Sequence, residues 1–93
     1  MSKPKLTPQI AYNLAERLYE VTGERNARLE SMIAQDRYYA YSYAVDVLSG
    51  PFPEAEPVFA QDSYYARAYV RDVLKTPEDR ARFKEVQKWV NRS

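Results

Sequence analysis

The chain has 93 residues, of which 45% are hydrophobic and 29% are charged, a balance typical of one folded domain and unlike that of a disordered chain. It contains no cysteine and no histidine, which excludes disulfides, thiolate nucleophiles, and the commonest general base and metal ligand. The net charge is +1, but positions 1–62 are acidic overall and positions 63–93 are basic. Because no Lys or Arg occurs from 38 to 66, the middle of the chain is acidic as well as rich in tyrosine.

The predicted elements are all helices. Apolar residues recur at i, i+3, i+4, i+7 and i+8, which is the spacing of a helical stripe, and the alternation of a strand is absent. Helix starts are predicted at Thr7-Pro8, Asp36, Asp62 and Thr76-Pro77, and a helix end is predicted at Gly23. The expected helices cover about residues 8–22, 25–34, 36–48, 54–61, 63–75 and 77–90.

A repeat runs through these helices. Residues 34–48, AQDRYYAYSYAVDVL, match residues 60–74, AQDSYYARAYVRDVL, at an offset of 26. A weaker copy at 11–19 matches 40–48 at an offset of 29. Long helices thus alternate with short ones, and each pair needs its neighbours to bury its apolar stripe.

These patterns predict a compact all-α single domain of about six helices, built at 7–93 from stacked long/short helix-pair repeats. Residues 1–6 are expected to form a loose N-terminus. The apolar runs are short and no signal-type segment opens the chain, so a membrane or secreted protein is not predicted. We expect a cytoplasmic location, in the protein's own cell or in a host.

The stretch PFPEAEPVFAQDSYYARAYVRDVLK resembles a short helical repeat found mainly in phage proteins and in some bacterial ones. That repeat has an Arg, then Trp or Phe, then Pro-Glu-Ala-Glu, with a later Tyr-Ala and a closing Val-Leu. The match covers about residues 25–75 and is looser in the first copy, where RNARLESMIAQD replaces the Pro-Glu-Ala-Glu stretch. Pro51 stands at the position of the Arg, and Val70 at that of the Ala after Tyr. The resemblance implies an all-helical fold and a phage source; it implies no enzymatic activity and carries over no functional residue.

The stripe shared by the copies should face the core. Tyr43 and Tyr69 belong to this stripe, and their hydroxyls are expected to reach the edge of the domain, within reach of a partner. The opposite face differs between copies, so a specific use is expected there. Its equivalent triplets are Gln9-Tyr12-Glu16, Tyr38-Tyr41-Val45 and Tyr64-Arg67-Arg71.

The apolar aromatic stripe of Tyr38, Tyr41 and Val45 is not needed for the packing of the repeat itself. If it is exposed, it predicts a protein interface, because tyrosine is enriched in binding hot spots. The alternative is that the N-terminal helix or the Trp89 segment covers it.

A further helical stripe near the C-terminus is expected to close the core. It comprises Phe83, Val86, Trp89 and Val90. Truncation before Phe83 is therefore expected to unfold the domain.

Carboxylates recur in pairs across the copies: Glu30/Glu56, Asp36/Asp62 and Asp46/Asp72. A helix cap or an ion pair is needed once in each copy, whereas an active site is needed once in a protein. We therefore expect no enzyme, no catalytic residue, no metal site and no cofactor.

The leading hypothesis is a non-catalytic protein-binding module, encoded by a phage, that inhibits or modulates a host complex such as one of host defence. Its acidic, tyrosine-rich middle would occupy a basic surface of that complex. The predicted partner-binding residues are Tyr38, Tyr41, Val45, Glu54, Glu56, Tyr64, Arg67 and Arg71. Two alternatives stay open: nucleic-acid binding through the basic C-terminal third, and a structural or self-associating repeat protein.

Overall fold

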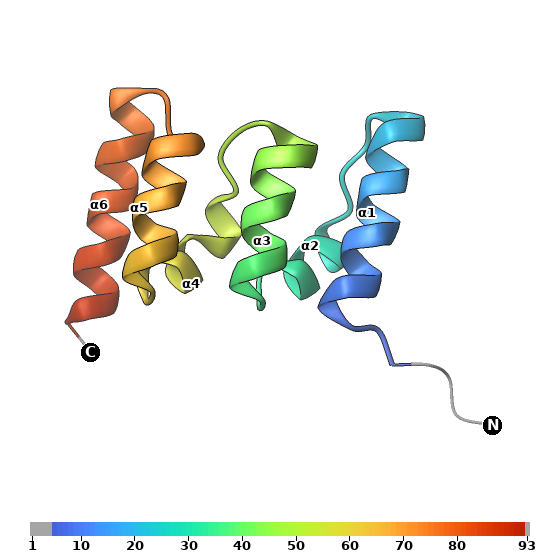
Figure 1. The fold of residues 1–93 in the computed structure, drawn as a ribbon, viewed down its shortest axis with the longest axis horizontal. Coiled ribbons are helices and arrows are strands. Elements are labelled where there is room, and N and C mark those ends of the chain that lie inside the picture. Colours follow the sequence, from blue (N-terminus) through green and yellow to red (C-terminus); the bar gives the residue numbers. More distant parts are fainter. Residues whose placement is uncertain (1–4, 93) are drawn as a thin grey trace.

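The computed structural model describes residues 5–92, and within them the chain forms helices and no strand (Figure 1). The elements are α1 (Pro8–Thr22), α2 (Ala27–Ile33), α3 (Arg37–Ser42), the π-helix η1 (Tyr43–Leu48), the 3₁₀-helix η2 (Pro53–Ala55), α4 (Glu56–Ala60), α5 (Ser63–Asp72) and α6 (Pro77–Asn91). The predicted all-α single domain is confirmed. Of the loose N-terminus predicted at 1–6, residues 1–4 lie outside the described part, and Leu6 is half-buried against the core.

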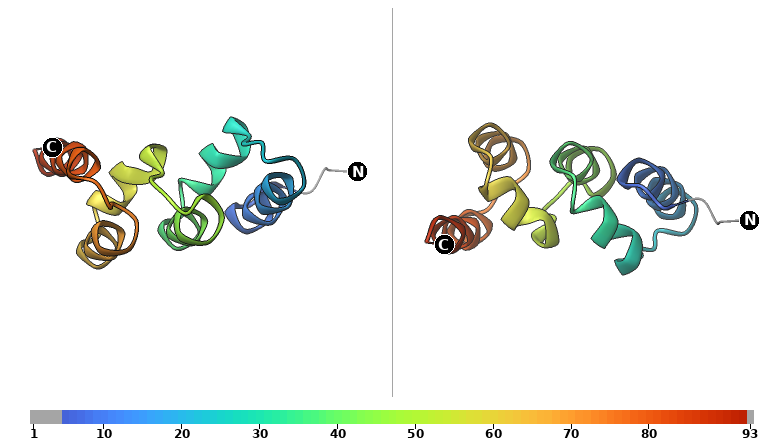
Figure 2. Two further views of the ribbon diagram at one scale, coloured as in Figure 1. Left: turned by 90° about the horizontal axis from the view of Figure 1, so that it is seen from above. Right: turned by 90° about the horizontal axis from the view of Figure 1, so that it is seen from below.

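The helices form two rows (Figure 2). The long helices α1, α3 and α5 lie side by side in one row, while α2, α4 and α6 form the other. The molecule measures 44 × 29 × 19 Å, and the rows run along its longest dimension. The last helix, α6, packs chiefly on α4. It therefore lies at the C-terminal end of the row that begins with α2 and α4.

The predicted caps start the helices. The hydroxyl oxygen of Thr7 accepts the Ile10 N–H at 3.2 Å, and that of Thr76 accepts the Asp79 N–H at 3.1 Å. Gly23 ends α1 with φ 74°, a left-handed conformation that favours glycine.

The two aspartate caps have the same geometry. Asp36 Oδ1 accepts the N–H groups of the first two tyrosines of α3 at 3.0 and 3.2 Å. Asp62 Oδ1 does the same at the start of α5, again at 3.0 and 3.2 Å. These aspartates therefore fix where both tyrosine-rich helices begin.

Small and aromatic side chains fill the core between the rows. Alanines let neighbouring helices approach closely, and buried rings occupy the space that they leave. The largest buried aromatic side chains are Tyr43, Phe52, Phe59, Tyr69 and Phe83. Each contributes about 1.5–3 kcal/mol relative to an exposed position.

The helix predicted at 36–48 changes from an α-helix to a π-helix partway along its length. After Ser42 it continues as a π-helix, and it ends where Ser49 takes a left-handed conformation with φ 50°. The wider winding also marks the end of α5, where the Leu74 N–H bonds the Tyr69 oxygen five residues back at 3.1 Å. The helix predicted at 63–75 consequently stops at Asp72.

Trp89 does not close the core, which corrects the prediction for the C-terminal stripe. Its side chain is 76% exposed, whereas Phe83 is buried and packs its ring 5.2 Å from that of Tyr69. Val86 and Val90 are half-buried against the core. Trp89 lies at the outer edge of the stripe on α6, so the inner residues are covered and the indole remains in solvent.

Candidate functional site

A buried carboxylate joins α2 to the π-helix. The Tyr43 hydroxyl donates to Glu30 Oε2 at 2.7 Å. Arg25 donates to the same carboxylate through Nε at 2.7 Å and through Nη2 at 3.1 Å. Burial, followed by the bond to Glu30, raises the pKa of Tyr43. The phenol therefore stays protonated and holds the carboxylate by a charge-assisted hydrogen bond.

A second cluster has the same chemistry, 26 residues further along. The Tyr69 hydroxyl donates to Glu56 Oε2 at 2.6 Å, and Arg82 Nη2 lies 2.6 Å from the same oxygen. The Tyr69 oxygen also accepts the buried Phe52 N–H at 2.9 Å. Burial and the bond to Glu56 raise the pKa of Tyr69.

The arginine is the one member that does not recur at the same offset. Pro51 stands where the second copy would have its equivalent of Arg25, and Arg82 reaches the carboxylate from α6 instead. Every buried polar side-chain atom in residues 5–92 has a hydrogen-bond partner. The two clusters are therefore closed internal networks that tie the helices together.

These networks correct two predictions. The hydroxyls of Tyr43 and Tyr69 do not reach the edge of the domain, because each is buried against its own glutamate. Glu56 cannot contact a partner, because its side chain is only 1% exposed and both its oxygens bind Arg82.

The long helices contact one another through tyrosines at equivalent positions. Tyr12 of α1 packs on Tyr39 of α3 with ring centroids 5.8 Å apart, and Tyr41 of α3 packs on Tyr65 of α5 at the same distance. The Tyr41 hydroxyl also donates to Asp72 of α5. Each tyrosine thus bridges its helix to the next helix along the row.

Tyr12 and Tyr41 each have acidic neighbours. Burial, then the charges of Glu16 and Asp46, raise the pKa of Tyr12. For Tyr41 the raising causes are burial and the bond to Asp72. The Arg71 guanidinium and the Tyr41 hydroxyl hold the pKa of Asp72 well below its usual range.

The stripe of Tyr38, Tyr41 and Val45 is divided between surface and interior. Tyr38 is 58% exposed, whereas Tyr41 and Val45 are half-buried. The helix that covers Tyr41 is α5, through Tyr65, which differs from both covering segments that were predicted. The reason is the row arrangement, in which α5 follows α3 directly.

The other predicted site residues lie apart from this stripe. Tyr64 is 71% exposed at the start of α5, and Arg67 and Arg71 are exposed further along the same helix. Glu54 is exposed within η2 and accepts a hydrogen bond from the Ser31 hydroxyl at 2.7 Å. The structure therefore brings Tyr64, Arg67 and Arg71 onto one helix but does not join them to Glu54.

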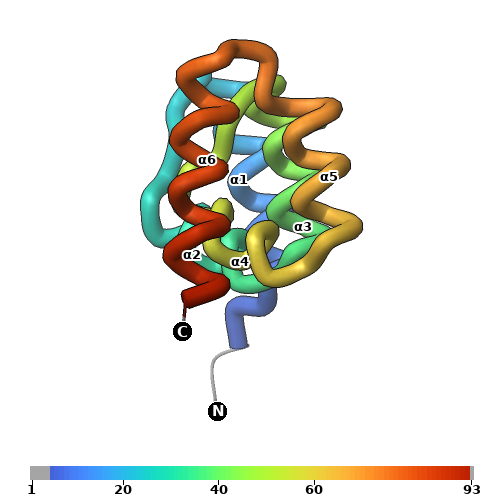
Figure 3. Tube along the Cα trace, turned by 90° about the vertical axis from the view of Figure 1, so that its left-hand side faces the viewer, coloured from blue at the N-terminus to red at the C-terminus, as the bar shows by residue number. Residues whose placement is uncertain are grey.

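The C-terminal end of the molecule is formed by the antiparallel helices α5 and α6 (Figure 3). Two adjoining hollows lie between these helices, with volumes of about 420 and 330 Å³. Val70 and Gln87 line both hollows. The remaining lining residues are Ser63, Ala66, Arg67, Arg71, Arg80, Ala81, Phe83 and Lys84. We call these residues together the end groove.

The end groove has an apolar floor and a basic rim. Val70 and Phe83 supply the floor, while arginines of α5 and α6 and Lys84 surround it. Arg71 is paired with Asp72 at 2.9 Å, and Arg80 Nε donates to the Leu74 oxygen at 2.8 Å. For Arg67 and Lys84 no ion pair occurs with any described residue.

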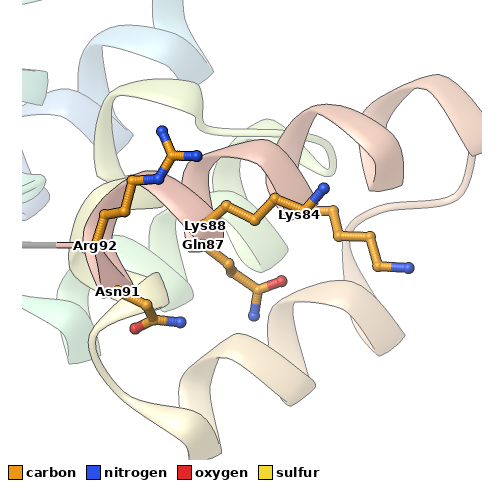
Figure 4. A pocket seen from close by; sticks show the side chains of 5 residues that line it. All are labelled: Lys84, Gln87, Lys88, Asn91 and Arg92. Atoms are coloured by element: carbon orange, nitrogen blue, oxygen red, sulfur yellow. The ribbon is translucent and has the colours of Figure 1, made fainter.

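A basic row continues along α6 beside the end groove. Lys84, Lys88 and Arg92 follow one another at four-residue spacing and project from the helix with Gln87 and Asn91 (Figure 4). The open hollow that these five residues line has a volume of about 540 Å³. Lys88 pairs with Glu85 at 3.4 Å, and both side chains are well exposed.

A third surface feature surrounds the exposed indole. Trp89, Val86, Val90 and Pro57 line an apolar hollow of about 370 Å³ between α6 and α4. Residues of α6 therefore line this apolar hollow, the end groove and the hollow beside the basic row. The sequence reasoning missed this because it assigned α6 to closure of the core.

The signal for the end groove was visible in the alignment of the copies. Tyr12 and Tyr41 stand at equivalent positions of the first two long helices, and Arg67 stands at that position of the last. The side chain that bridges to the next helix is thus a tyrosine in α1 and α3, and a basic side chain takes its place in α5. Gln87 and Lys84 carry no such signal, because α6 has no equivalent among the short helices.

Residues 5–92 lack two features that mark other classes of function. No group of three or more acidic side chains there could hold a metal ion. No helix in that part of the chain has the length and apolar character needed to cross a membrane. Comparisons with protein-family models, curated proteins and solved structures found no match to this chain.

Proposed function

We propose that this protein is a non-catalytic binding module, and that it holds an amphipathic helix of a partner protein in the end groove. In the long-helix row α3 contacts α1 and α5 contacts α3, and the groove is lined by the last of these helices, α5, together with α6. A helix lying there would continue the long-helix row. The observation that carries the proposal is an open groove with an apolar floor and a basic rim at this place in the row.

The charge of the groove favours a partner helix with acidic flanks. Arg67 and Lys84 lie on opposite sides of the floor and are free of ion pairs with described residues. An apolar stripe on the partner would cover the half-buried Val70, beside the already buried Phe83, while acidic residues next to that stripe would meet the rim. Such complementarity accelerates association and excludes basic partners.

The acidic middle of the chain is less suited to docking than the sequence predicts. Glu56 is buried, and Asp62 caps α5 while pairing with Arg37 at 3.3 Å. These two carboxylates serve the fold. The exposed acids that remain in this stretch are Asp46 and Glu54, which lie on different elements, η1 and η2.

The resemblance to phage-encoded repeats makes a host complex the first partner to test. Wild-type protein and a Gln87→Trp variant would be used to capture proteins from a host lysate, and captured proteins would be purified and titrated. Gln87 lines both hollows, so an indole there fills the groove without a change of charge. Gln9→Trp places the same side chain on exposed α1 and serves as the control.

We expect Gln87→Trp to weaken binding of the purified partner at least tenfold, while Gln9→Trp binds as the wild type does. Equal binding by all three proteins would contradict the proposed site. Circular dichroism melting of each variant shows that the fold is retained.

A second candidate function is nucleic-acid binding by the basic row of α6. The specific observation is the alignment of Lys84, Lys88 and Arg92 along one open face. A fluorescence titration with short single-stranded RNA and DNA tests it. Salt-dependent binding that Lys88→Glu/Arg92→Glu abolishes would favour this candidate over the binding of a helix.

A further inference from the structure

We infer that the end groove selects a helix that presents a carboxylate to Arg67, and that Arg17 prevents α1 of a second copy from occupying it. This inference names the partner chemistry of the proposed function and rests on it. Its basis is the register in which the long helices contact one another.

The register places a tyrosine of one helix against an aspartate of the next. Tyr41 of α3 donates its hydroxyl to Asp72 of α5. One step earlier, α1 contacts η1, the element that carries Asp46, and burial followed by the charges of Glu16 and Asp46 raises the pKa of Tyr12. The two tyrosines are 29 residues apart and the two aspartates 26 apart, which are the offsets of the copies.

On the first and last helices of the row, arginine stands at one of these two positions. Arg67 lies 26 residues after Tyr41, so it occupies the tyrosine position on the last long helix. Arg17 lies 29 residues before Asp46, so it occupies the aspartate position on the first. Both arginines are exposed.

The outward face of α1 would otherwise suit the end groove. Ile10 is equivalent to Tyr39 by the same offset, and on α1 it is followed at i+4 and i+11 by the exposed Leu14 and Val21. In the row, residues at this position pack against the preceding long helix. A second copy stacked head to tail would therefore bury its apolar stripe in the groove.

Such a stack would place Arg17 of one copy opposite Arg67 of the other. Like charges at an apolar contact oppose association, so the groove rejects the chain's own α1. A helix with Asp or Glu at that position would instead pair with Arg67. The same arginine thus favours an acidic partner helix and disfavours a second copy.

Four proteins with every combination of charge at the two positions test this inference. They are the wild type, Arg17→Asp, Arg67→Asp, and the double variant Arg17→Asp/Arg67→Asp. Sedimentation equilibrium at low salt measures their association constants. Arg28→Asp on exposed α2 provides the same change of net charge at a site outside the contact.

We expect each single variant to associate head to tail about tenfold or more strongly than the wild type, because a repulsive pair becomes an attractive one. The double variant and Arg28→Asp should remain as monomeric as the wild type. Added salt should weaken the association of the single variants. Melting curves verify that all five proteins are folded.

The inference is overturned if neither single variant associates more than Arg28→Asp does, or if the double variant associates as strongly as the single variants. A wild type that already forms head-to-tail stacks would also overturn it. These results are separate from the capture experiment. Loss of binding by Gln87→Trp without association of the single variants supports the groove and refutes the role of the arginines. Association of the single variants without loss of binding by Gln87→Trp refutes the proposed partner site, and with it the partner carboxylate, and supports only the rejection of a second copy.

Discussion

Arg82 of α6 binds the buried carboxylate of Glu56 through Nη2 at 2.6 Å and Nε at 3.3 Å. In the first cluster the arginine comes from residue 25, five positions before its glutamate. In the second it comes from 26 positions after its glutamate. The Arg82–Glu56 ion pair therefore holds α6 against α4, in addition to the packing of Phe83 on Tyr69.

Replacing Arg82 by Met should destabilise the protein strongly. The change leaves the buried Glu56 carboxylate with the Tyr69 hydroxyl as its remaining partner. Removal of one member of a buried pair costs about 3–5 kcal/mol, and we expect about 2–3 kcal/mol because Arg82 is partly exposed. Urea unfolding measures this loss.

The matched control for Arg82 is Lys88→Met on the same helix. The Lys88–Glu85 pair is exposed on both sides, so its loss should change the free energy of unfolding by less than about 0.5 kcal/mol. Equal effects of the two substitutions would show that the Glu56 contact does not hold α6.

The two buried tyrosines should differ in their response to loss of the hydroxyl. Tyr69→Phe removes the donor to Glu56 and also leaves the buried Phe52 N–H without its acceptor. Tyr43→Phe removes the donor to Glu30. We expect losses of about 3 and about 2 kcal/mol respectively in urea unfolding. A larger loss for Tyr43→Phe would contradict the assigned network.

Alkaline pH should unfold the protein through these same phenols. The pKa values of Tyr43 and Tyr69 are raised in the folded state, because burial and the neighbouring glutamates disfavour the phenolate. Their contribution is complete below the pKa of an unfolded tyrosine, about 10, and is lost as the pH rises above it.

Absorbance of tyrosinate together with circular dichroism checks the alkaline prediction. Exposed tyrosines such as Tyr64 should titrate while the helices persist, and a late group should ionise only as helicity is lost. Ionisation of all nine tyrosines before any loss of helicity would contradict the burial of the two phenols.

Alanine substitution of the two aromatic residues of α6, Phe83 and Trp89, should have different effects on the free energy of unfolding. Phe83→Ala should cost about 3–5 kcal/mol, because it empties a fully buried site against Tyr69. Trp89→Ala should change stability by less than about 0.5 kcal/mol. Emission from the single tryptophan should match that of a solvated indole, and a buried, blue-shifted emission would refute its exposure.

Local rules account for the parts of the fold that the sequence predicted. A capping aspartate acts on the next few N–H groups, so Asp36 and Asp62 could be assigned from their neighbours in the chain. The helical stripe likewise identified Tyr43 and Tyr69 as core residues. Both inferences need only the spacing within one helix.

Contacts between distant segments account for the failures. Helical spacing places Tyr43 on the core face, but the direction of its hydroxyl depends on Glu30, which lies on another helix. The repeated Glu–Tyr spacing of 13 residues is a signal that could have identified the bond. The contact of Arg82 with Glu56 has only the weak signal of Pro51 at the arginine position.

The surface prediction failed for a related reason. Tyr38 and Tyr41 share one face of α3, yet the neighbouring helix α5 covers Tyr41 and leaves Tyr38 in solvent. A single helix does not reveal which of its sides the next helix will cover. The end groove also requires two helices, so the stripe on α5 alone could not show it.

The most direct test of the central claim is site-specific photo-crosslinking in the complex with the captured partner. A photoreactive side chain would be placed at Lys84 on the rim of the end groove, or at Tyr38 on the stripe that the sequence favoured. We predict crosslinks from position 84 to one helical segment of the partner and none from position 38. Crosslinks from position 38 without any from position 84 would contradict the claim that the end groove is the binding site.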